Sequence, residues 1–180
     1  SYRLLTLLRS ATFRSFRFIR CIEGVLLCFF IKNGIHESVL VHFLESFDAK
    51  KEGTLVGFCV LGGSFSEGID LRGERLIGAI IVGVGLPTIS TELNIIKEYF
   101  DNTRENGYAY AYTYPGMIKV LQAAGRVIRS EEERGVVVLI DDRFATPEYF
   151  ELMPDHWRHL QFLTNANDLL AEVTDFWKKS

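Results

Sequence analysis

Three polar side chains in the second half of the chain have a spacing that suits the binding of a phosphoryl group. Gln122, Arg126 and Arg129 follow one another at intervals of four and three residues, which would place them on one face of a helix. Two guanidinium groups and a carboxamide can donate hydrogen bonds to the negative charge that spreads over a phosphoryl group during transfer. The small residues 123–125 would let another surface approach this face. The alternative interpretation is an ordinary solvated helix face.

A second candidate is the glycine- and serine-rich segment 62–71, which follows an apolar run of strand length. Its glycines would let a ligand approach the backbone closely, and successive N–H groups there can form an anion-binding nest. The hydroxyl groups of Ser64 and Ser66 suit a phosphodiester, whereas the carboxylates of Glu67 and Asp70 suit a ribose hydroxyl or a facing arginine. The alternative interpretation is an ordinary turn from a strand into a helix.

Several common catalytic motifs are absent from the sequence. It contains no G-x-x-x-x-G-K-[ST], and therefore no Walker A phosphate loop, and neither a G-x-S-x-G elbow nor an H-E-x-x-H zinc motif. His156 and His159 have no cysteines near them in sequence, so no metal site is expected. Cys21, Cys28 and Cys59 are odd in number and form no C-x-x-C pair, which favours a reducing compartment over a disulfide framework or a structural zinc site.

The elements that must position these residues follow from the apolar pattern. Continuous apolar runs predict buried strands over 25–31, 54–61, 75–84 and 135–140. Helical spacing predicts helices over 36–47, 89–102, 117–129, 147–152 and 165–178. Strands that alternate with helices imply a parallel, doubly wound sheet, in which ligands bind at the carboxyl ends of the strands. This rule points to the loops 62–70, 85–90 and 141–144.

Four tyrosines alternate with small residues between Tyr108 and Tyr114. Alternation with a period of two predicts a half-buried strand. The other interpretation is a strip of rings on which nucleic-acid bases stack, and Phe65 is a further candidate for such stacking.

The composition fits one globular domain of 180 residues. Apolar residues make up 48% and charged residues 24%, which argues against intrinsic disorder. The net charge of −3 indicates no global basic field, which does not exclude a local one. No apolar run reaches the roughly 18 residues of a membrane span, and no signal peptide is recognisable. We therefore expect a soluble cytoplasmic domain without a membrane partner.

Together, the two candidate segments resemble motifs V and VI of the superfamily 2 helicases. The sequence S-F-S-E-G-I-D over 64–70 is followed some fifty residues later by Q-x-x-G-R-x-x-R over 122–129. The S-F-x-E-G-I-D form, G-L-P over 85–87 and L-I-D-D-R-F over 139–144 are similar to the DinG/XPD-like DNA helicases. The resemblance covers roughly residues 43–160. It implies a RecA-like fold of the P-loop NTPase type: three α/β/α layers around a mainly parallel sheet.

In that family, ATP lies between two RecA-like domains, and the first supplies the Walker A lysine and the acids that bind Mg²⁺. The resemblance identifies this chain as the second domain, which lacks Walker A. It implies that Arg129 is the arginine finger, that Arg126 contacts phosphate beside it, and that Gln122 lies on the nucleotide side of the cleft. It also implies that the motif V segment couples the nucleotide to DNA, through Glu67, Gly68 and Asp70 for the nucleotide and Ser64, Phe65 and Ser66 for the DNA.

The function implied is the C-terminal half of an ATP-dependent DNA helicase with a role in DNA repair, inactive as an isolated fragment. Its cofactor would be ATP with Mg²⁺, and its partners would be single-stranded or forked DNA and the N-terminal RecA-like domain of the same protein. The family's iron–sulfur cluster, where present, is bound by the first half, so no cluster is expected here. Residues 1–42 match the family pattern poorly, so we divide the chain into this N-terminal segment and a C-terminal RecA-like domain over 43–180.

Two other hypotheses stay open. The first is a non-catalytic nucleic-acid-binding or adaptor module that keeps the RecA-like fold. The second is an independent nucleotide-binding enzyme that uses 62–68 as its phosphate loop and Asp141 as a metal ligand.

Overall fold

The computed structural model describes residues 2–7, 26–30, 41, 44–47, 54–62, 71, 75–127 and 133–179.

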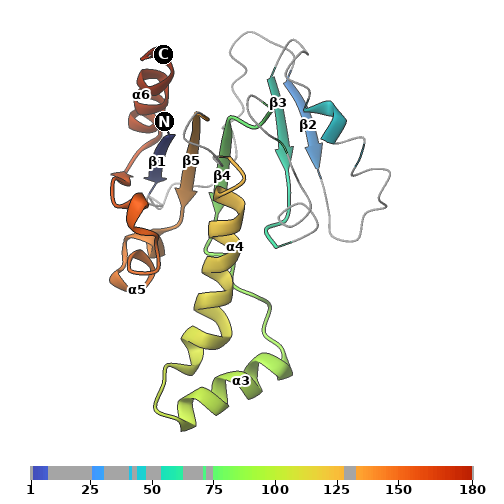
Figure 1. The fold of residues 1–180 in the computed structure, drawn as a ribbon, viewed down its shortest axis with the longest axis vertical. Coiled ribbons are helices and arrows are strands. Elements are labelled where there is room, and N and C mark those ends of the chain that lie inside the picture. Colours follow the sequence, from blue (N-terminus) through green and yellow to red (C-terminus); the bar gives the residue numbers. More distant parts are fainter. Residues whose placement is uncertain are drawn as a thin grey trace.

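A parallel sheet of four strands organises this part of the chain (Figure 1). The strand order is β4-β5-β1-β6, with the bounds Gly78–Val82, Gly135–Ile140, Tyr2–Leu7 and Gln161–Leu163 respectively. Each pairing within this sheet is parallel. Val82 at the end of β4 is in register with Ile140 at the end of β5, so the carboxyl ends of these two strands meet at one edge.

Two further strands, β2 (Leu26–Phe30) and β3 (Thr54–Phe58), pair in parallel as a separate ribbon. The chain that leaves β3 comes back against the loop that follows β4. Leu61 Cδ2 lies 3.0 Å from the position that a Cβ on Gly85 would take. The end of β3 is therefore close to the edge at which β4 and β5 end.

Helices and short helical turns make up most of the remaining described chain. They are α3 (Thr91–Asn102), the π-helix η2 (Ala109–Thr113), α4 (Tyr114–Ala124), the 3-10 turn η3 (Asp142–Ala145), α5 (Pro147–Phe150), the 3-10 turn η4 (Asp155–Trp157) and α6 (Ala166–Lys178). Ser90 and Asn165 cap α3 and α6, because each side chain accepts a hydrogen bond from a backbone N–H in the first turn.

The sheet is covered on both faces, which gives the three layers expected from the sequence. Alternate residues of β5 point to opposite faces: Val137 and Leu139 join the cluster around Met117 and Val120 of α4, whereas Val136 and Val138 pack against α6. Leu139 is fully buried, and burial of such a side chain stabilises the fold by about 1.5–3 kcal/mol. Strand β5 is thus the hydrophobic centre of the domain.

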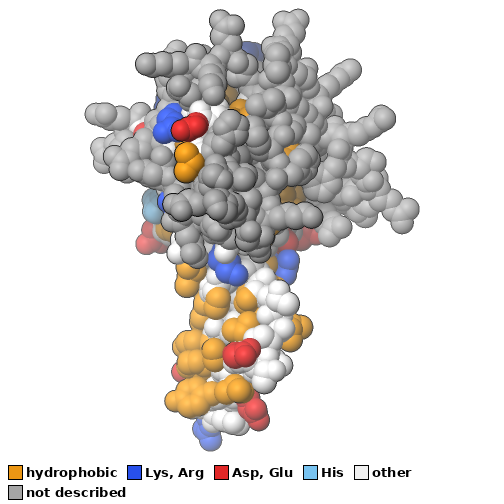
Figure 2. All heavy atoms as spheres, turned by 90° about the vertical axis from the view of Figure 1, so that its right-hand side faces the viewer, with side chains coloured by type: hydrophobic (Ala, Val, Ile, Leu, Met, Phe, Trp, Pro, Cys, Tyr) orange, Lys and Arg blue, Asp and Glu red, His pale blue; other side chains and the backbone are white. Residues whose placement is uncertain are grey.

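A helical hairpin, made of α3 and η2 (residues 91–113), extends away from the sheet (Figure 1). No residue of α3 is buried. The two arms are joined by the Tyr112 hydroxyl, which donates to Asn94 Oδ1 at 3.0 Å, and by the stacked rings of Phe100 and Tyr110, whose centroids lie 3.9 Å apart. Hydrophobic side chains run along this hairpin (Figure 2).

The helix expected over 36–47 is described only in part. Val41 and residues 44–46 are helical. Arg75 holds the end of this segment, because its Nε donates to the carbonyl of Phe47 and its Nη2 to the carbonyl of Leu44, both at 2.9 Å. These are carbonyl groups that a helix leaves without intrahelical partners at its C-terminus.

The structure confirms strands within all four expected ranges and helices at 91–102, 147–150 and 166–178. The sequence analysis did not predict β1 or β6. Strand β1 nevertheless occupies an inner position in the sheet, between β5 and β6. The proposed division at residues 42 and 43 stays a prediction.

The strand expected over Tyr108–Tyr114 is wrong, because this segment is the π-helix η2 and its flanks. Rings four residues apart touch on a helix, and the centroids of Tyr108–Tyr112 and of Tyr110–Tyr114 are each 5.1 Å apart. The helix expected from residue 117 begins earlier, at Tyr114. Pro115 occupies the first turn of α4, where a missing N–H is tolerated, and the wide π turn precedes it.

Candidate functional site

The candidate site lies at the edge where β4 and β5 end. The loop after β4 stays in contact with β5 there, since the Gly83 N–H donates to the Ile140 carbonyl at 3.0 Å. Two of the three loops expected to carry a ligand, 85–90 and 141–144, therefore leave the sheet at a common edge. Of the third loop, 62–70, only Gly62 is described.

Close backbone contact fixes α4 against this edge. Gly85 has a φ of +66°, which favours glycine. A Cβ on Gly116 would lie 2.6 Å from the Val84 carbonyl oxygen, and a Cβ on Gly85 would lie 2.8 Å from the Gly116 carbonyl oxygen. The loop after β4 and the first turn of α4 can therefore touch only because both positions lack side chains.

Helix α4 presents Gln122 on its exposed side, while Val120 and Ala124 are buried in the core. The helix ends at Ala124, which is earlier than the expected end at residue 129. The Gly125 N–H donates to the Leu121 carbonyl at 2.9 Å and closes the last turn.

Arg126 lies in the tight turn that follows α4. Its N–H donates to the Ala123 carbonyl at 3.3 Å, and the N–H of Val127 donates to the Ala124 carbonyl at 3.1 Å. Val127 is buried, so this side chain anchors the turn in the core while Arg126 stays partly exposed. The single helical face that the sequence suggested for Gln122 and Arg126 is therefore replaced by a helix end and the turn after it.

The other expected site residues lie outside the described residues. They are Arg129, the nucleotide-side residues Glu67, Gly68 and Asp70, and the DNA-side residues Ser64, Phe65 and Ser66. Their roles stay predictions.

The chain after β5 forms an ion pair within a single turn. Arg143 Nε donates to Asp141 Oδ1 and its Nη2 to Asp141 Oδ2, both at 2.8 Å. Asp141 also accepts from the Arg143 backbone N–H at 3.0 Å and thereby caps η3. The hydrogen bonds to this carboxylate raise the pKa of Arg143 above its usual value. Because both carboxylate oxygens bind the guanidinium, the arrangement disfavours Asp141 as a metal ligand.

Two kinds of site are absent from the part of the chain that is described. No group of three His, Cys, Asp or Glu side chains there could hold a metal ion. No helix among those residues is both long and apolar enough to cross a membrane.

Sequence reasoning missed Lys119, whose side chain lies against Gly62 at the start of the third loop. A Cβ on Gly62 would lie 2.9 Å from Lys119 Cδ. The signal that could have revealed it is its place three residues before Gln122, which makes the two side chains neighbours on the helix surface.

Comparison with known proteins identifies a family and several relatives of this chain. The family model of the helicase C-terminal domain matches residues 16–160. The chain is 36% identical over 95 residues to the ATP-dependent DNA helicase DinG of Photobacterium profundum, which covers 52% of this chain and 14% of that protein. It is also 36% identical over 98 residues to the ATP-dependent DNA helicase chl-1 of Caenorhabditis elegans, which covers 54% of this chain and 12% of that protein.

A solved structure named XPD_APO has the same fold. It superimposes with a TM-score of 0.60 at 18% identity and covers 77% of this chain and 28% of that one. This likeness confirms the expected RecA-like α/β fold. The chain thus spans only a small share of the length of the curated relatives it matches.

Proposed function

The chain belongs to the helicase C-terminal domain family, and on this premise we propose that it acts as the second motor domain of an ATP-dependent DNA helicase of the DinG/XPD type. Its task is to complete the ATP site formed with an N-terminal RecA-like domain of the same protein. The relatives that it resembles are ATP-dependent DNA helicases by name. We place the whole protein in the cytoplasm and in DNA repair.

The observation that carries this proposal is the position of Gln122 and Arg126. Both lie at the C-terminal end of α4, a helix whose first turn touches the loop after β4 through Gly116. A carboxamide and a guanidinium are hydrogen-bond donors that fit phosphate oxygens. The buried side chains on either side of them, Val120 and Val127, anchor the backbone that carries these two donors.

Arg129 follows three residues after Arg126, and we assign it the role of arginine finger. Bound ATP would supply the phosphoryl group, and its Mg²⁺ would be held by the first motor domain. The residues of this chain orient the phosphates and stabilise negative charge as it moves toward the leaving group. No iron–sulfur cluster is assigned to this chain.

The segment that starts at Gly62 would carry the DNA. Gly62 lies against Lys119, and Leu61 just before it lies against Gly85, which belongs to the loop after β4. Residues 64–66 would contact the backbone of single-stranded or forked DNA, whose phosphates position a bound strand. Glu67, Gly68 and Asp70 would connect this strand to the nucleotide.

The test measures the rate of ATP hydrolysis by the full-length protein that contains this chain, with and without single-stranded DNA. We expect DNA to stimulate hydrolysis and the Arg129→Ala substitution to lower kcat by about 10³–10⁵. The matched control is Arg158→Ala, because Arg158 is an exposed arginine paired with Asp155 and should leave the rate unchanged. Stimulated hydrolysis that Arg129→Ala leaves intact would contradict the proposed finger. A protein that binds DNA without hydrolysing ATP would favour the adaptor hypothesis.

A further inference from the structure

Exposed apolar side chains line one side of the helix that continues from η2 (Ala109–Thr113) into α4 (Tyr114–Ala124). Tyr110, Tyr114 and Ile118 follow one another at intervals of four residues and are 37%, 37% and 54% exposed. Side chains four residues apart are neighbours on a helix surface, and the rings of Tyr110 and Tyr114 touch edge to face with their centroids 5.1 Å apart. The three side chains therefore form one continuous row, which we call the apolar row.

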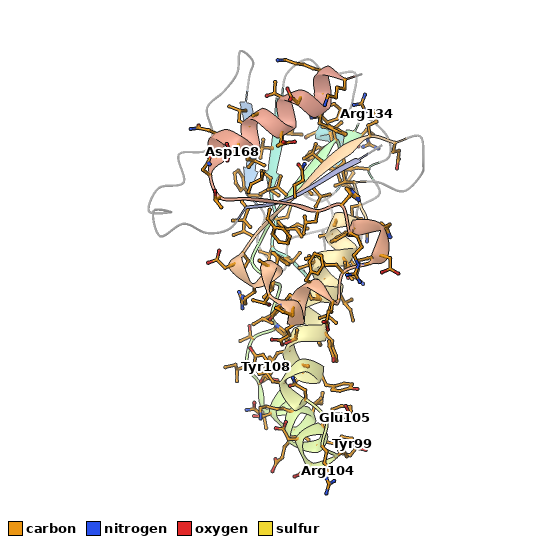
Figure 3. The ribbon with its side chains drawn as sticks, turned by 90° about the vertical axis from the view of Figure 1, so that its left-hand side faces the viewer. Tyr99, Arg104, Glu105, Tyr108, Arg134 and Asp168 are labelled. Carbon is orange, nitrogen blue, oxygen red and sulfur yellow. The ribbon has the colours of Figure 1, made fainter. Side chains whose placement is uncertain are left out.

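The apolar row continues onto the other arm of the hairpin. The ring of Tyr110 stacks on that of Phe100 in α3, and the ring of Phe100 touches that of the exposed Tyr99, with their centroids 5.3 Å apart. Hydrophobic side chains accordingly run along the hairpin in Figure 2, and Tyr99 lies at its far end in Figure 3. A contiguous apolar surface that the fold leaves in water marks an interaction site.

The charges around the apolar row indicate the class of partner. Residues 91–113 carry four carboxylates and two cationic side chains, namely Glu92, Glu98, Asp101 and Glu105 against Lys97 and Arg104. This negative balance repels the phosphates of a nucleic acid, and Ile118 has no ring on which a base could stack. Aromatic side chains are typical of the centre of a protein–protein interface. The hairpin thus favours a protein surface with an apolar centre and a basic rim over a nucleic acid.

The position of the apolar row indicates where this protein surface comes from. Gln122 is exposed and follows Ile118 by four residues in α4, so the row leads to a side chain to which we assign contact with the nucleotide. A surface that covers the row would therefore also lie beside the nucleotide. The relatives that this chain matches are several times longer than the part it covers, so a protein of this type has polypeptide elsewhere to form that surface. Both observations favour a part of the same polypeptide as the partner.

We propose that the apolar row, extended by Phe100 and Tyr99, is a docking surface for the domain of the same polypeptide that closes over the nucleotide. Docking buries the row and places the partner beside Gln122. The identity of the partner domain rests on the proposed function, whereas the burial of the row by protein does not.

The experiment measures the oxidation of individual tyrosines by hydroxyl radicals in the full-length protein, with mass spectrometry as the readout. Tyr108 is the matched reference, because it is 44% exposed and lies two residues before Tyr110, which places it on the opposite side of the helix. We expect Tyr110 and Tyr114 to be oxidised at least about fivefold more slowly than Tyr108, because side chains at the centre of a protein interface lose contact with water. Their exposure in this domain alone would give the three tyrosines similar rates.

Substitutions of Ile118 test whether the apolar row itself makes the contact. Ile118→Asp places a carboxylate in the row, which is costly to bury, and should raise the oxidation rates of Tyr110 and Tyr114 toward that of Tyr108. Ile118→Leu should keep both tyrosines protected. Leu170→Asp is the matched control, because Leu170 is 56% exposed and belongs to α6, far from the hairpin (Figure 1). Thermal melting shows whether each variant is folded.

Equal oxidation of Tyr108, Tyr110 and Tyr114 in the unmodified protein would overturn the proposal. Protection that appears only when single-stranded DNA is added would assign the row to nucleic acid instead, and protection that is lost on dilution would assign it to a second copy of the protein. Protection that persists in Ile118→Asp would show that the contact does not involve the row. The proposed motor function fails separately, in the hydrolysis assay with Arg129→Ala, so either proposal can fail while the other stands.

Discussion

The sheet and the helical hairpin of this protein are stabilised in different ways. Five of the six residues of β5 are buried, whereas α3 has no buried residue. The sheet region depends on hydrophobic burial spread over many side chains, which tolerates small changes at any one of them. The hairpin combines an exposed arm, α3, with the buried residues of η2 (Ala109, Ala111, Tyr112 and Thr113) and a few specific contacts between the two. The same kind of substitution should therefore have global effects in the sheet and local effects in the hairpin.

The contacts of the hairpin are few and well defined. Gly107 is buried, and its N–H donates to Asp101 Oδ1 at 3.0 Å. Figure 3 shows Tyr99, Arg104 and Glu105 at the far end of the hairpin, with Arg134 and Asp168 at the opposite end of the molecule. At the base, Thr113 donates to Glu148 Oε1 at 3.2 Å. Such a region is expected to open locally at a lower free energy than the whole domain unfolds.

The largest effect is expected from Leu139→Ala in the centre of the sheet. Leu139 is fully buried between α4 and the segment after β5, so the cavity should lower the free energy of unfolding by about 2–5 kcal/mol. Urea denaturation measures this loss. The matched control is Ile80→Ala on the neighbouring strand, where the side chain is 66% exposed and the effect should stay within about 0.5 kcal/mol.

Hydrogen exchange of the same variant tests whether the hairpin opens independently of the sheet. If the hairpin opens by itself, its amides should keep their opening free energies in Leu139→Ala, while those of β5 lose stability. Equal losses in both regions would show that the hairpin and the sheet unfold together, and the comparison would then fail.

A smaller effect is expected when one methyl group is added in each region. A Cβ on Gly107 would overlap the Lys97 carbonyl oxygen and lie 2.6 Å from Asp101 Oδ1, and one on Gly116 would lie 2.6 Å from the Val84 carbonyl oxygen. Each substitution by alanine should cost about 1–3 kcal/mol. Gly116→Ala should lower the global free energy of unfolding, whereas Gly107→Ala should release the hairpin alone.

Limited proteolysis reports the difference between these two variants. Gly107→Ala should speed cleavage between residues 91 and 113, with the urea midpoint little changed. Gly83→Ala is the control, because a Cβ there meets nothing within 4 Å and adds only the strain of a positive φ. Faster cleavage of the hairpin in Gly116→Ala alone would reverse the assignment.

The apolar pattern predicted β2 to β5 and helix α3, but it missed β1 and β6 and gave the wrong structure for η2. A continuous apolar run such as residues 135–140 is typical of a strand that is buried on both faces. The predicted bounds of β5 therefore agree with the observed ones. Strand β6 has only three residues, too few for a pattern. The tyrosines of η2 alternate as in a strand, but their contacts are ring against ring within a helix, and a period of two does not distinguish the two cases.

The candidate site, too, could be predicted only in part from the sequence. The spacing of Gln122 and Arg126 predicted a single helical face, because a helical wheel cannot show that the helix stops at Ala124. Lys119 was overlooked because its partner is the backbone of Gly62, 57 residues away in sequence. Contacts between a side chain and a distant glycine leave no periodic signal, so only the fold reveals them.

The smallest effect concerns the charge pair that supports Gly107. Lys97 Nζ lies 2.6 Å from Asp101 Oδ2, and this hydrogen bond, with the one from the Gly107 N–H, lowers the pKa of Asp101 below its usual range. A carboxyl group with a lowered pKa stabilises the folded hairpin above its ordinary pKa, and this contribution is lost as the pH falls through the lowered value. Acid should therefore loosen the hairpin before the sheet, and salt should weaken the effect because the pair is exposed.

The amide proton of Gly107 provides the measurement, because it donates directly to the titrating carboxylate. Its NMR shift should follow a titration whose midpoint lies below that of a free aspartate, and Asp101→Asn should abolish this titration. Lys97→Met should move the midpoint up toward the ordinary value, since the first cause of the lowered pKa is then gone. The β5 amides should not follow the same curve, because no residue of that strand contacts the pair. A shared midpoint in both regions would mean that the charge pair stabilises the whole domain. The hairpin would then not be stabilised independently of the sheet.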